Sequence, residues 1–360
     1  MPKRFLVFFF SLMMISVLWC SLEKEAYAKT KEIVITDNAT ILIKKGDKVK
    51  IKVAKSEKSP VVSFKSKDKK IVAVSGSIFT AKKTGKVVVQ MLDKKKKVVD
   101  TISIRVEDED FTYIAHRGLS AYYPQNTLRA FKEAYLHGAD GVECDLYEAE
   151  NGDLMVFHDM TLNAICGKNK VITKVNTTNR KKFPIVNASG VSKCTKAELI
   201  MPTIDEVLSQ ARSYGKKVYI HMKVKSEGVS YDFSEAGAKK LLKVIQKYKM
   251  EDDVVLISAS SLYLSWFFDT GIELGKNTSA ASRKELDECL DWCRENSFKG
   301  VSKLLIVNYS GLYNKEAGKS FCDACHDEGF EIGLYWVKNN SMYVTGKKYG
   351  VDFVQGNSIF

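Results

Sequence analysis

Strand-like runs and helix-length segments alternate along this chain from residue 112 to its end. "YIAHRG" precedes "NTLRAFKEAYLHG", "PTIDEVLSQARSYG" precedes "KVYIHMKVK", and "EAGAKKLLKVIQKYK" precedes "DVVLISAS". Repeated units of this kind over about 250 residues are typical of one closed α/β barrel. A doubly wound sheet would need a Gly-rich phosphate loop after its first strand, and "HRGLSAYYP" is not one. We therefore predict an α/β fold, a TIM (β/α)8 barrel, over residues 111–360.

The segment before the barrel has a different sequence pattern. Short alternating runs such as "KVKIKVAK", "KIVAVSG" and "KVVVQ" are broken by Gly and Lys, and no helical period is visible. This pattern is typical of a β-sandwich. The run "VSFKSKDKKIVAVSGSIFTAKKTGKVVVQ" resembles the bacterial immunoglobulin-like modules of surface proteins, which often have Trp where Phe64 stands. We expect an N-terminal all-β immunoglobulin-like sandwich over residues 29–107, with the acidic stretch "EDEDF" (Glu107–Phe111) as a hinge at the boundary.

The net charge of +13 belongs to this module. Residues 30–106 hold 20 Lys and Arg against 7 Asp and Glu, whereas residues 107–360 hold 32 against 34. A lysine-rich module of an exported protein would be drawn to an anionic cell-wall polymer or a membrane surface. An ordinary solvated surface is the alternative. Nucleic acid is not an expected partner, because no aromatic residues are interleaved with the lysines as stacking platforms.

The first residues have the features of a secretory signal peptide. Lys3 and Arg4 precede an apolar run that ends near Trp19, and "AYA" offers small residues for cleavage after residue 28. The run is shorter than the roughly 20 apolar residues that a membrane-spanning helix needs. We expect a signal peptide over residues 1–28 and a secreted or cell-surface protein. Lipoprotein anchoring at Cys20 is not expected, because Trp19 stands where a small residue is required.

Seven of the eight cysteines lie beyond the signal peptide. Cys289 and Cys293 lie one helical turn apart, and Cys322, Cys325 and His326 form "CDACH". The export route favours disulfides among these four cysteines. The alternatives are a structural zinc site, covalent haem at the C-x-x-C-H pattern, and free buried thiols.

Polar side chains gather where the predicted barrel strands end, which is where α/β barrels place their active sites. Residues two apart on a strand share a face, so the two carboxylates of "ECD" point the same way. A lone histidine is usually a core or surface residue, but three of the five histidines fall at such strand ends. The candidate site residues are His116, Arg117, Glu143, Asp145, His158, His221 and Lys223.

The stretch "YIAHRGLSAYYPQNTLRAFKEAYLHGADGVECDLYEAENGDLMVFHDMTLN" resembles the glycerophosphodiester phosphodiesterase family. That family has H-R-G, P-E-N-T, G-A-D with E-x-D, and H-D in this order. "MPTIDEVL", "GLYWVKNN" and "YGVDFV" resemble later segments of the family. The resemblance implies a TIM barrel and a metal-dependent hydrolase of lipid metabolism, which cleaves glycerophosphodiesters to glycerol 3-phosphate and an alcohol.

The candidate residues suit this chemistry. Arg117 offers bidentate hydrogen bonds to phosphate oxygens, and Lys223 adds a point charge. His116 and His158 form the acid/base pair, because imidazole titrates near neutral pH. In the family, the glycerol 2-hydroxyl is thought to attack first and form a cyclic phosphate that water then opens. The spacing of the histidines does not tell which is the base and which is the acid.

Two departures from the family pattern affect the expected single divalent metal ion, which is Mg²⁺ or Ca²⁺ by resemblance. Gln125 replaces the Glu of P-E-N-T, and His221 stands where the family places a third carboxylate ligand. Glu143, Asp145 and His221 together would suit Mn²⁺ or Zn²⁺. Alternatively, the two carboxylates hold Mg²⁺ or Ca²⁺ weakly, or the barrel is inactive and only binds ligand. The remaining enzymatic alternative is a phospholipase D-like lyase that leaves a cyclic phosphate.

The end of the chain departs as well. The family closes on T-D-x-P, and this chain closes on "VQGNSIF". We interpret this as a change at the last strand end and the mouth of the substrate site.

Overall fold

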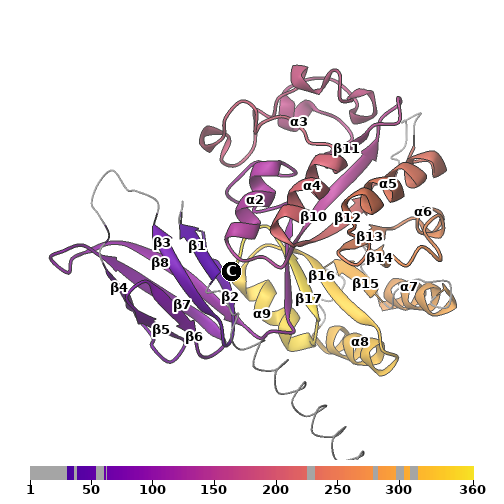
Figure 1. Ribbon diagram of the computed structural model, residues 1–360. Coiled ribbons are helices and arrows are strands. Elements are labelled where there is room, and N and C mark those ends of the chain that lie inside the picture. Colours follow the sequence, from indigo (N-terminus) through magenta and orange to yellow (C-terminus); the bar gives the residue numbers. More distant parts are fainter. Residues whose placement is uncertain are drawn as a thin grey trace, which may run out of the picture.

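The computed structural model describes residues 31–35, 39–53, 61, 63–224, 232–278, 283–296, 304–308 and 315–360. The predicted signal peptide lies outside these residues. The described chain forms an N-terminal β module and an α/β barrel, and the C-terminus lies between the two (Figure 1). Among the helices in these ranges, none combines the length and the apolar character needed to cross a membrane.

The N-terminal module consists of two four-stranded sheets with the strand orders β1-β3-β6-β5 and β2-β8-β7-β4. Its strands are β1 (Lys31–Ile35), β2 (Ile41–Lys44), β3 (Lys48–Val53), β4 (Ser63–Ser66), β5 (Val72–Ser75), β6 (Ile78–Ala81), β7 (Gly85–Leu92) and β8 (Val98–Glu107). The alternating apolar residues of the two sheets form one buried cluster that includes Phe79, Val89 and Ile104. Two sheets around one core support the predicted all-β sandwich, and its immunoglobulin-like character stays a prediction.

The second part is a closed barrel of eight parallel strands, as the alternation predicted. Its strands are β9 (Thr112–His116), β10 (Gly141–Glu148), β12 (Lys217–Met222), β13 (Val254–Ser258), β14 (Glu273–Thr278), β15 (Leu304–Asn308), β16 (Glu331–Val337) and β17 (Phe353–Gly356). The barrel closes because β9 pairs with both β10 and β17. A short antiparallel strand, β11 (Leu154–Val156), extends β10 on one side.

Helices surround the barrel and connect its strands (Figure 1). They are α2 (Leu128–Leu136), α3 (Asn163–Cys166), α4 (Ile204–Tyr214), α5 (Glu235–Tyr248), α6 (Ser261–Ser265), α7 (Arg283–Asn296), α8 (Lys315–Asp327) and α9 (Asn340–Tyr349), with 3-10 turns η1 (Ile172–Lys174), η2 (Arg180–Lys182) and η3 (Val191–Lys193). Local sequence sets their ends. Helix α4 begins with a capping box, in which Thr203 and Glu206 satisfy each other's backbone N–H groups.

Strand β12 shows how the alternation positions the site. Val218, Ile220 and Met222 are fully buried against the outer helices, as predicted. Tyr219 and His221 alternate with them and therefore point into the barrel. Tyr219 packs on Phe353 with a centroid separation of 5.4 Å, so aromatic rings fill the barrel below His221.

The module is packed directly against the barrel. Lys44 Nζ lies 2.9 Å from Asp140 Oδ2, and the Arg105 guanidinium donates to the backbone carbonyl of Phe360. Glu107 is only 2% exposed, because Arg105 and Lys347 pair with it, whereas Glu109 and Asp110 lie exposed between β8 and β9. The hinge at Glu107–Phe111 stays a prediction, and buried ion pairs hold its first residue.

The cysteine expectations are corrected. All seven cysteines that the structure describes are free thiols. Cys293, Cys322 and Cys325 are completely buried in the apolar layer between barrel and helices, so they act as core residues. His326 instead pairs at the surface with Asp352, at 3.0 Å. Neither the disulfides nor covalent haem fits this arrangement, and the free-thiol alternative holds.

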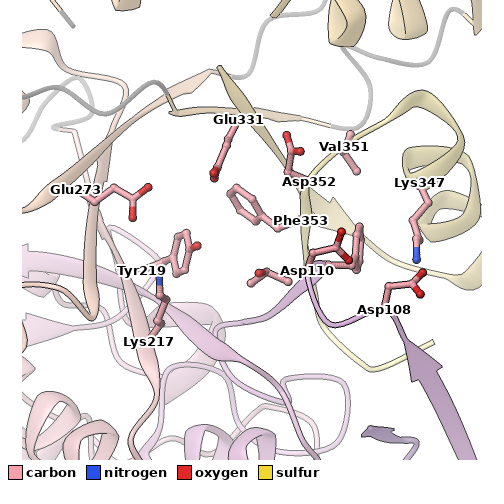
Figure 2. A pocket seen from close by; sticks show the side chains of 12 residues that line it. Asp108, Asp110, Lys217, Tyr219, Glu273, Glu331, Lys347, Val351, Asp352 and Phe353 are labelled. Carbon is pink, nitrogen blue, oxygen red and sulfur yellow. The ribbon is translucent and has the colours of Figure 1, made fainter. Parts of the chain in front are cut away.

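A cavity of about 510 Å³ lies at the amino ends of the barrel strands, beside the junction with the module (Figure 2). Charged side chains line much of it, among them Asp108, Lys217, Glu273 and Glu331. None of the predicted site residues lines this cavity. They gather at the opposite end of the barrel, where the strands terminate.

Candidate active site

His116 is the last residue of β9 and is 6% exposed. Its Nδ1–H donates to Asn357 Oδ1 over 2.7 Å, which leaves the Nε2 lone pair 3.8 Å from Glu143 Oε2. Burial, and then the charge of Arg117, lower the pKa of His116 to about 3. The ring is therefore neutral at physiological pH and offers an acceptor nitrogen to the site.

Arg117 and Asn126 adopt left-handed backbone conformations, with φ of 57° and 55°. Such conformations are uncommon for residues other than Gly and concentrate at functional sites. They turn the chain so that the Arg117 backbone N–H donates to Glu143 and its guanidinium lies 3.2 Å from Asp145. Gln125 accepts from Arg117 Nη1 at 2.7 Å, so the residue that departs from the family pattern still orients the arginine.

Glu143 and Asp145 lie on the inner face of β10 and are 2% and 1% exposed. Burial, and then repulsion from Asp145, raise the pKa of Glu143 to about 8. Burial alone would also raise the pKa of Asp145, but Arg117, His221 and Lys223 hold it well below its usual range. The protein's own cations therefore favour the anionic form of Asp145, whereas burial and the neighbouring Asp145 favour the neutral form of Glu143.

His221 and Lys223 complete the cluster from the end of β12. The His221 Nδ1 atom lies 3.4 Å from Asp145 Oδ1 and 3.9 Å from Glu143 Oε1, and Lys223 Nζ lies 3.5 Å from Asp145 Oδ1. Burial, countered in part by Asp145, lowers the pKa of His221. On its other side, His221 Nε2 lies 3.1 Å from Asn277 Nδ2, on β14.

His158 follows β11 and is the most exposed of the site histidines, at 30% of its side chain. Its Nδ1 lies 2.6 Å from Asp159 Oδ1, and its backbone carbonyl accepts from the Tyr147 hydroxyl. The hydrogen bond to His158 lowers the pKa of Asp159. A carboxylate in this position orients the imidazole ring of His158.

The structure thus places all seven candidate residues at one end of the barrel. Their supporting residues were not anticipated: Asn126, Asp159, Asn277 and Asn357. Asp159 follows His158 directly in "HD", so its role was readable from the sequence. Asn126 belongs to "PQNT", which resembles the family's P-E-N-T, so it too was readable. Asn277 and Asn357 gave no comparable signal, since Asn is common in turns and loops.

The donor set of Glu143, Asp145 and His221 fits a divalent cation. Their donor atoms all lie within 4.8 Å of one another. Two carboxylates and an imidazole are ordinary ligands of Mn²⁺ and Zn²⁺. Both carboxylates are almost completely buried, and a cation held between them would balance their charge.

Two cationic side chains and three histidines surround a buried carboxylate pair at the carboxyl ends of the strands of a TIM barrel, which is where enzymes with this fold place their active sites. Comparison with known proteins identifies the family. A model of the glycerophosphoryl diester phosphodiesterase family matches residues 116–359. The chain belongs to this family.

Two relatives from bacteria match part of the chain. YqiK of Bacillus subtilis (strain 168) is 30% identical over 142 residues, which are 39% of this chain and 55% of that protein. A glycerophosphodiester phosphodiesterase of Caldanaerobacter subterraneus subsp. tengcongensis is 33% identical over 146 residues, 40% of this chain and 56% of that protein. The chain spans little more than half the length of these relatives.

A solved structure resembles a larger share of the chain. The phosphodiesterase of Oleispira antarctica, in complex with the product sn-glycerol-3-phosphate, has a TM-score of 0.57. It is 20% identical and covers 68% of this chain and 92% of that one. This likeness shows a shared fold.

Proposed function

We propose that the protein is a secreted, divalent-metal-dependent phosphodiesterase that hydrolyses glycerophosphodiesters to glycerol 3-phosphate and an alcohol. The observation that carries this proposal is the placement of two histidines and two cationic side chains around one buried carboxylate pair. Family membership and the product-bound Oleispira antarctica relative support the substrate class. The leader-like sequence of residues 1–28 supports secretion.

Arg117 and Lys223 hold the substrate phosphate. Asp145 and Gln125 hold the guanidinium of Arg117 in place. Its remaining N–H groups can donate to phosphate oxygens. Lys223 is 18% exposed and sits at the rim of the same cluster. A cation held by Glu143, Asp145 and His221 would neutralise charge on the non-bridging phosphate oxygens.

His116 is the base of the first step, and His158 is the acid. His116 Nε2 accepts the proton of the glycerol 2-hydroxyl while the hydroxyl oxygen bonds to phosphorus. His158 gives its proton to the leaving alcohol oxygen as the old P–O bond breaks, which leaves a cyclic phosphate.

The second step reverses these roles. His158, now neutral, takes a proton from the attacking water, and His116 returns its proton to the glycerol 2-oxygen as the ring opens. The assignment rests on the surroundings of the two rings. Burial and the charge of Arg117 favour a neutral His116, whose Nδ1–H is held by Asn357. His158 instead lies beside the Asp159 carboxylate, which would balance the charge of an imidazolium.

The metal of this proposal is Mn²⁺ or Zn²⁺. With His221 in place of a carboxylate, the site offers two anionic ligands, and imidazole suits these metals better than Mg²⁺ or Ca²⁺. Mg²⁺ and Ca²⁺ are included in the activity assay, because two carboxylates and water can also hold these cations weakly.

The lysine-rich module supplies the proposed contact with an anionic surface, either a phosphate-bearing cell-wall polymer or a membrane. Lys94–Lys97 form the exposed tip of the β7–β8 hairpin. Asp93 Oδ1 accepts from the backbone N–H groups of Lys95 and Lys97, so the tip has a defined shape. Changing the four lysines to Gln in the full chain should reduce salt-sensitive sedimentation with anionic vesicles or glycerophosphate polymer. Equal sedimentation of both proteins would refute this contact.

The enzymatic proposal is tested with glycerophosphocholine and Mg²⁺, Ca²⁺, Mn²⁺ or Zn²⁺, with products followed by phosphorus NMR. Glycerol 3-phosphate as the end product supports the hydrolase. Accumulation of a cyclic phosphate would instead indicate the lyase. Absence of turnover with every cation, from folded protein, would leave a ligand-binding barrel.

A further inference from the structure

The Asn277 side chain contacts His221 although their two strands are not adjacent in the barrel. It lies on β14, and β13 separates it from His221 on β12. The Asn277 side chain contacts Nε2 of His221 at 3.1 Å, and the opposite ring nitrogen, Nδ1, faces Asp145 and Glu143. The imidazole therefore stands between one amide and the two carboxylates.

This contact is linked to the position of the imidazole proton. With Nδ2 of Asn277 donating, Nε2 of His221 carries a lone pair and the proton is on Nδ1, facing Asp145. With the amide turned over, Oδ1 would accept from Nε2–H, and the Nδ1 lone pair would face the carboxylates. A nitrogen that binds a cation needs that second arrangement.

The Asn277 amide is also only half satisfied. Its Oδ1 is buried and makes no hydrogen bond within the part of the chain that the structure describes. A buried amide with one unpaired atom adds little stability compared with an apolar side chain of similar shape. Among the described residues, the Asn277 side chain contacts His221, and an amide can pair with either tautomer of an imidazole.

We propose that Asn277 is a positioning residue that sets the tautomer of His221. With Oδ1 turned to Nε2–H, it holds the Nδ1 lone pair toward Glu143 and Asp145 and makes His221 a cation ligand. This inference rests on the cation site of the proposed function. Hydrogen bonds from the second nitrogen of a ligating histidine typically change metal affinity by about 10–100-fold.

The test compares two substitutions in the full chain. Asn277→Leu keeps the shape and removes the hydrogen bond, whereas Asn277→Asp can only accept. Titration with Mn²⁺, followed by the electron paramagnetic resonance of the free ion, should show affinity about 10–100-fold weaker for Asn277→Leu. Asn277→Asp should bind at least as tightly as the wild type. Equal affinity of all three proteins would overturn the role of Asn277.

Because Asp also adds a charge, the tautomer is measured directly. Nitrogen-15 NMR of histidine-labelled protein loaded with Zn²⁺, with His221 assigned from a His221→Gln spectrum, should show a proton on Nε2. The same proton position in Asn277→Leu, with unchanged Mn²⁺ affinity, would contradict the inference and leave the cation site intact. A wild-type protein that binds none of the four cations would remove the site itself.

Discussion

Replacing His221 by Glu tests whether this residue faces the cation. Its Nδ1 lies 3.4 Å from Asp145 Oδ1 and 3.9 Å from Glu143 Oε1. Two like charges 4 Å apart repel by about 4 kcal/mol at an effective dielectric constant of 20. Arg117 and Lys223 offset part of this repulsion, so we expect the metal-free variant to be destabilised by about 1–3 kcal/mol, a typical range for one substitution.

The same substitution should strengthen binding of hard cations. A third carboxylate oxygen is the ligand that Mg²⁺ and Ca²⁺ prefer, and cation binding would relieve the repulsion. Recovery of about 1.4–2.8 kcal/mol corresponds to Mg²⁺ affinity that is about 10–100-fold tighter than in the wild type.

Urea unfolding with and without Mg²⁺ measures both effects, and calorimetry gives the affinity. His221→Gln is the matched control, because it removes the imidazole without adding charge and should weaken binding of every cation. If His221→Glu is as stable as the wild type without metal and binds Mg²⁺ no better, His221 does not face a cation.

Five further results are expected. His158→Ala should lower kcat by at least about 100-fold, because it removes half of the acid/base pair; near-normal turnover would exclude His158 as the acid. Asn357→Leu should lower kcat while Asn357→Asp retains it, since only Asp still accepts from His116 Nδ1–H; equal losses would point to a packing role. Because the pKa of Glu143 is raised to about 8, Mn²⁺ must displace a proton below that pH, and calorimetry should show affinity rising up to pH 8 and then levelling. The unfolding free energy of the metal-free protein should fall between pH 4.5 and 8. In this range the Glu143 carboxyl loses its proton in the unfolded chain but keeps it in the folded one. Arg105→Met should lower the unfolding free energy by about 2–4 kcal/mol through the junction of module and barrel, and a change within 0.5 kcal/mol would show that this junction adds no stability.

The barrel was readable from the sequence because each βα unit is specified locally. In "VYIHMKVK", alternation alone separated the outward Val218 and Ile220 from the inward His221. The junction with the module was not readable. Arg105 and Glu107 look like surface charges in the sequence, and only the packing of two distant segments buries them.

The site could be predicted in part for a related reason. His116, Glu143 and His221 end or line strands, so the barrel brings them together without further information. Asn277 on β14 and Asn357, which directly follows β17, support two of these residues from positions far away in the chain. Their partners depend on barrel closure, which no local pattern specifies.

The spacing of the cysteines in the sequence was not enough to predict their role. Residues one helical turn apart, such as Cys289 and Cys293, suit a disulfide, a zinc site or a core equally well. Burial decides among these, and Cys293 is completely buried in the outer apolar layer of the barrel.

The most direct test of the proposed function is turnover of glycerophosphocholine by the full-length protein after chelation and reloading with Mn²⁺. We predict release of glycerol 3-phosphate by the loaded wild type, loss on chelation, recovery on reloading, and no recovery in Glu143→Gln. Turnover that survives chelation, or that is unchanged in folded Glu143→Gln, would contradict a metal-dependent site at the carboxylate pair.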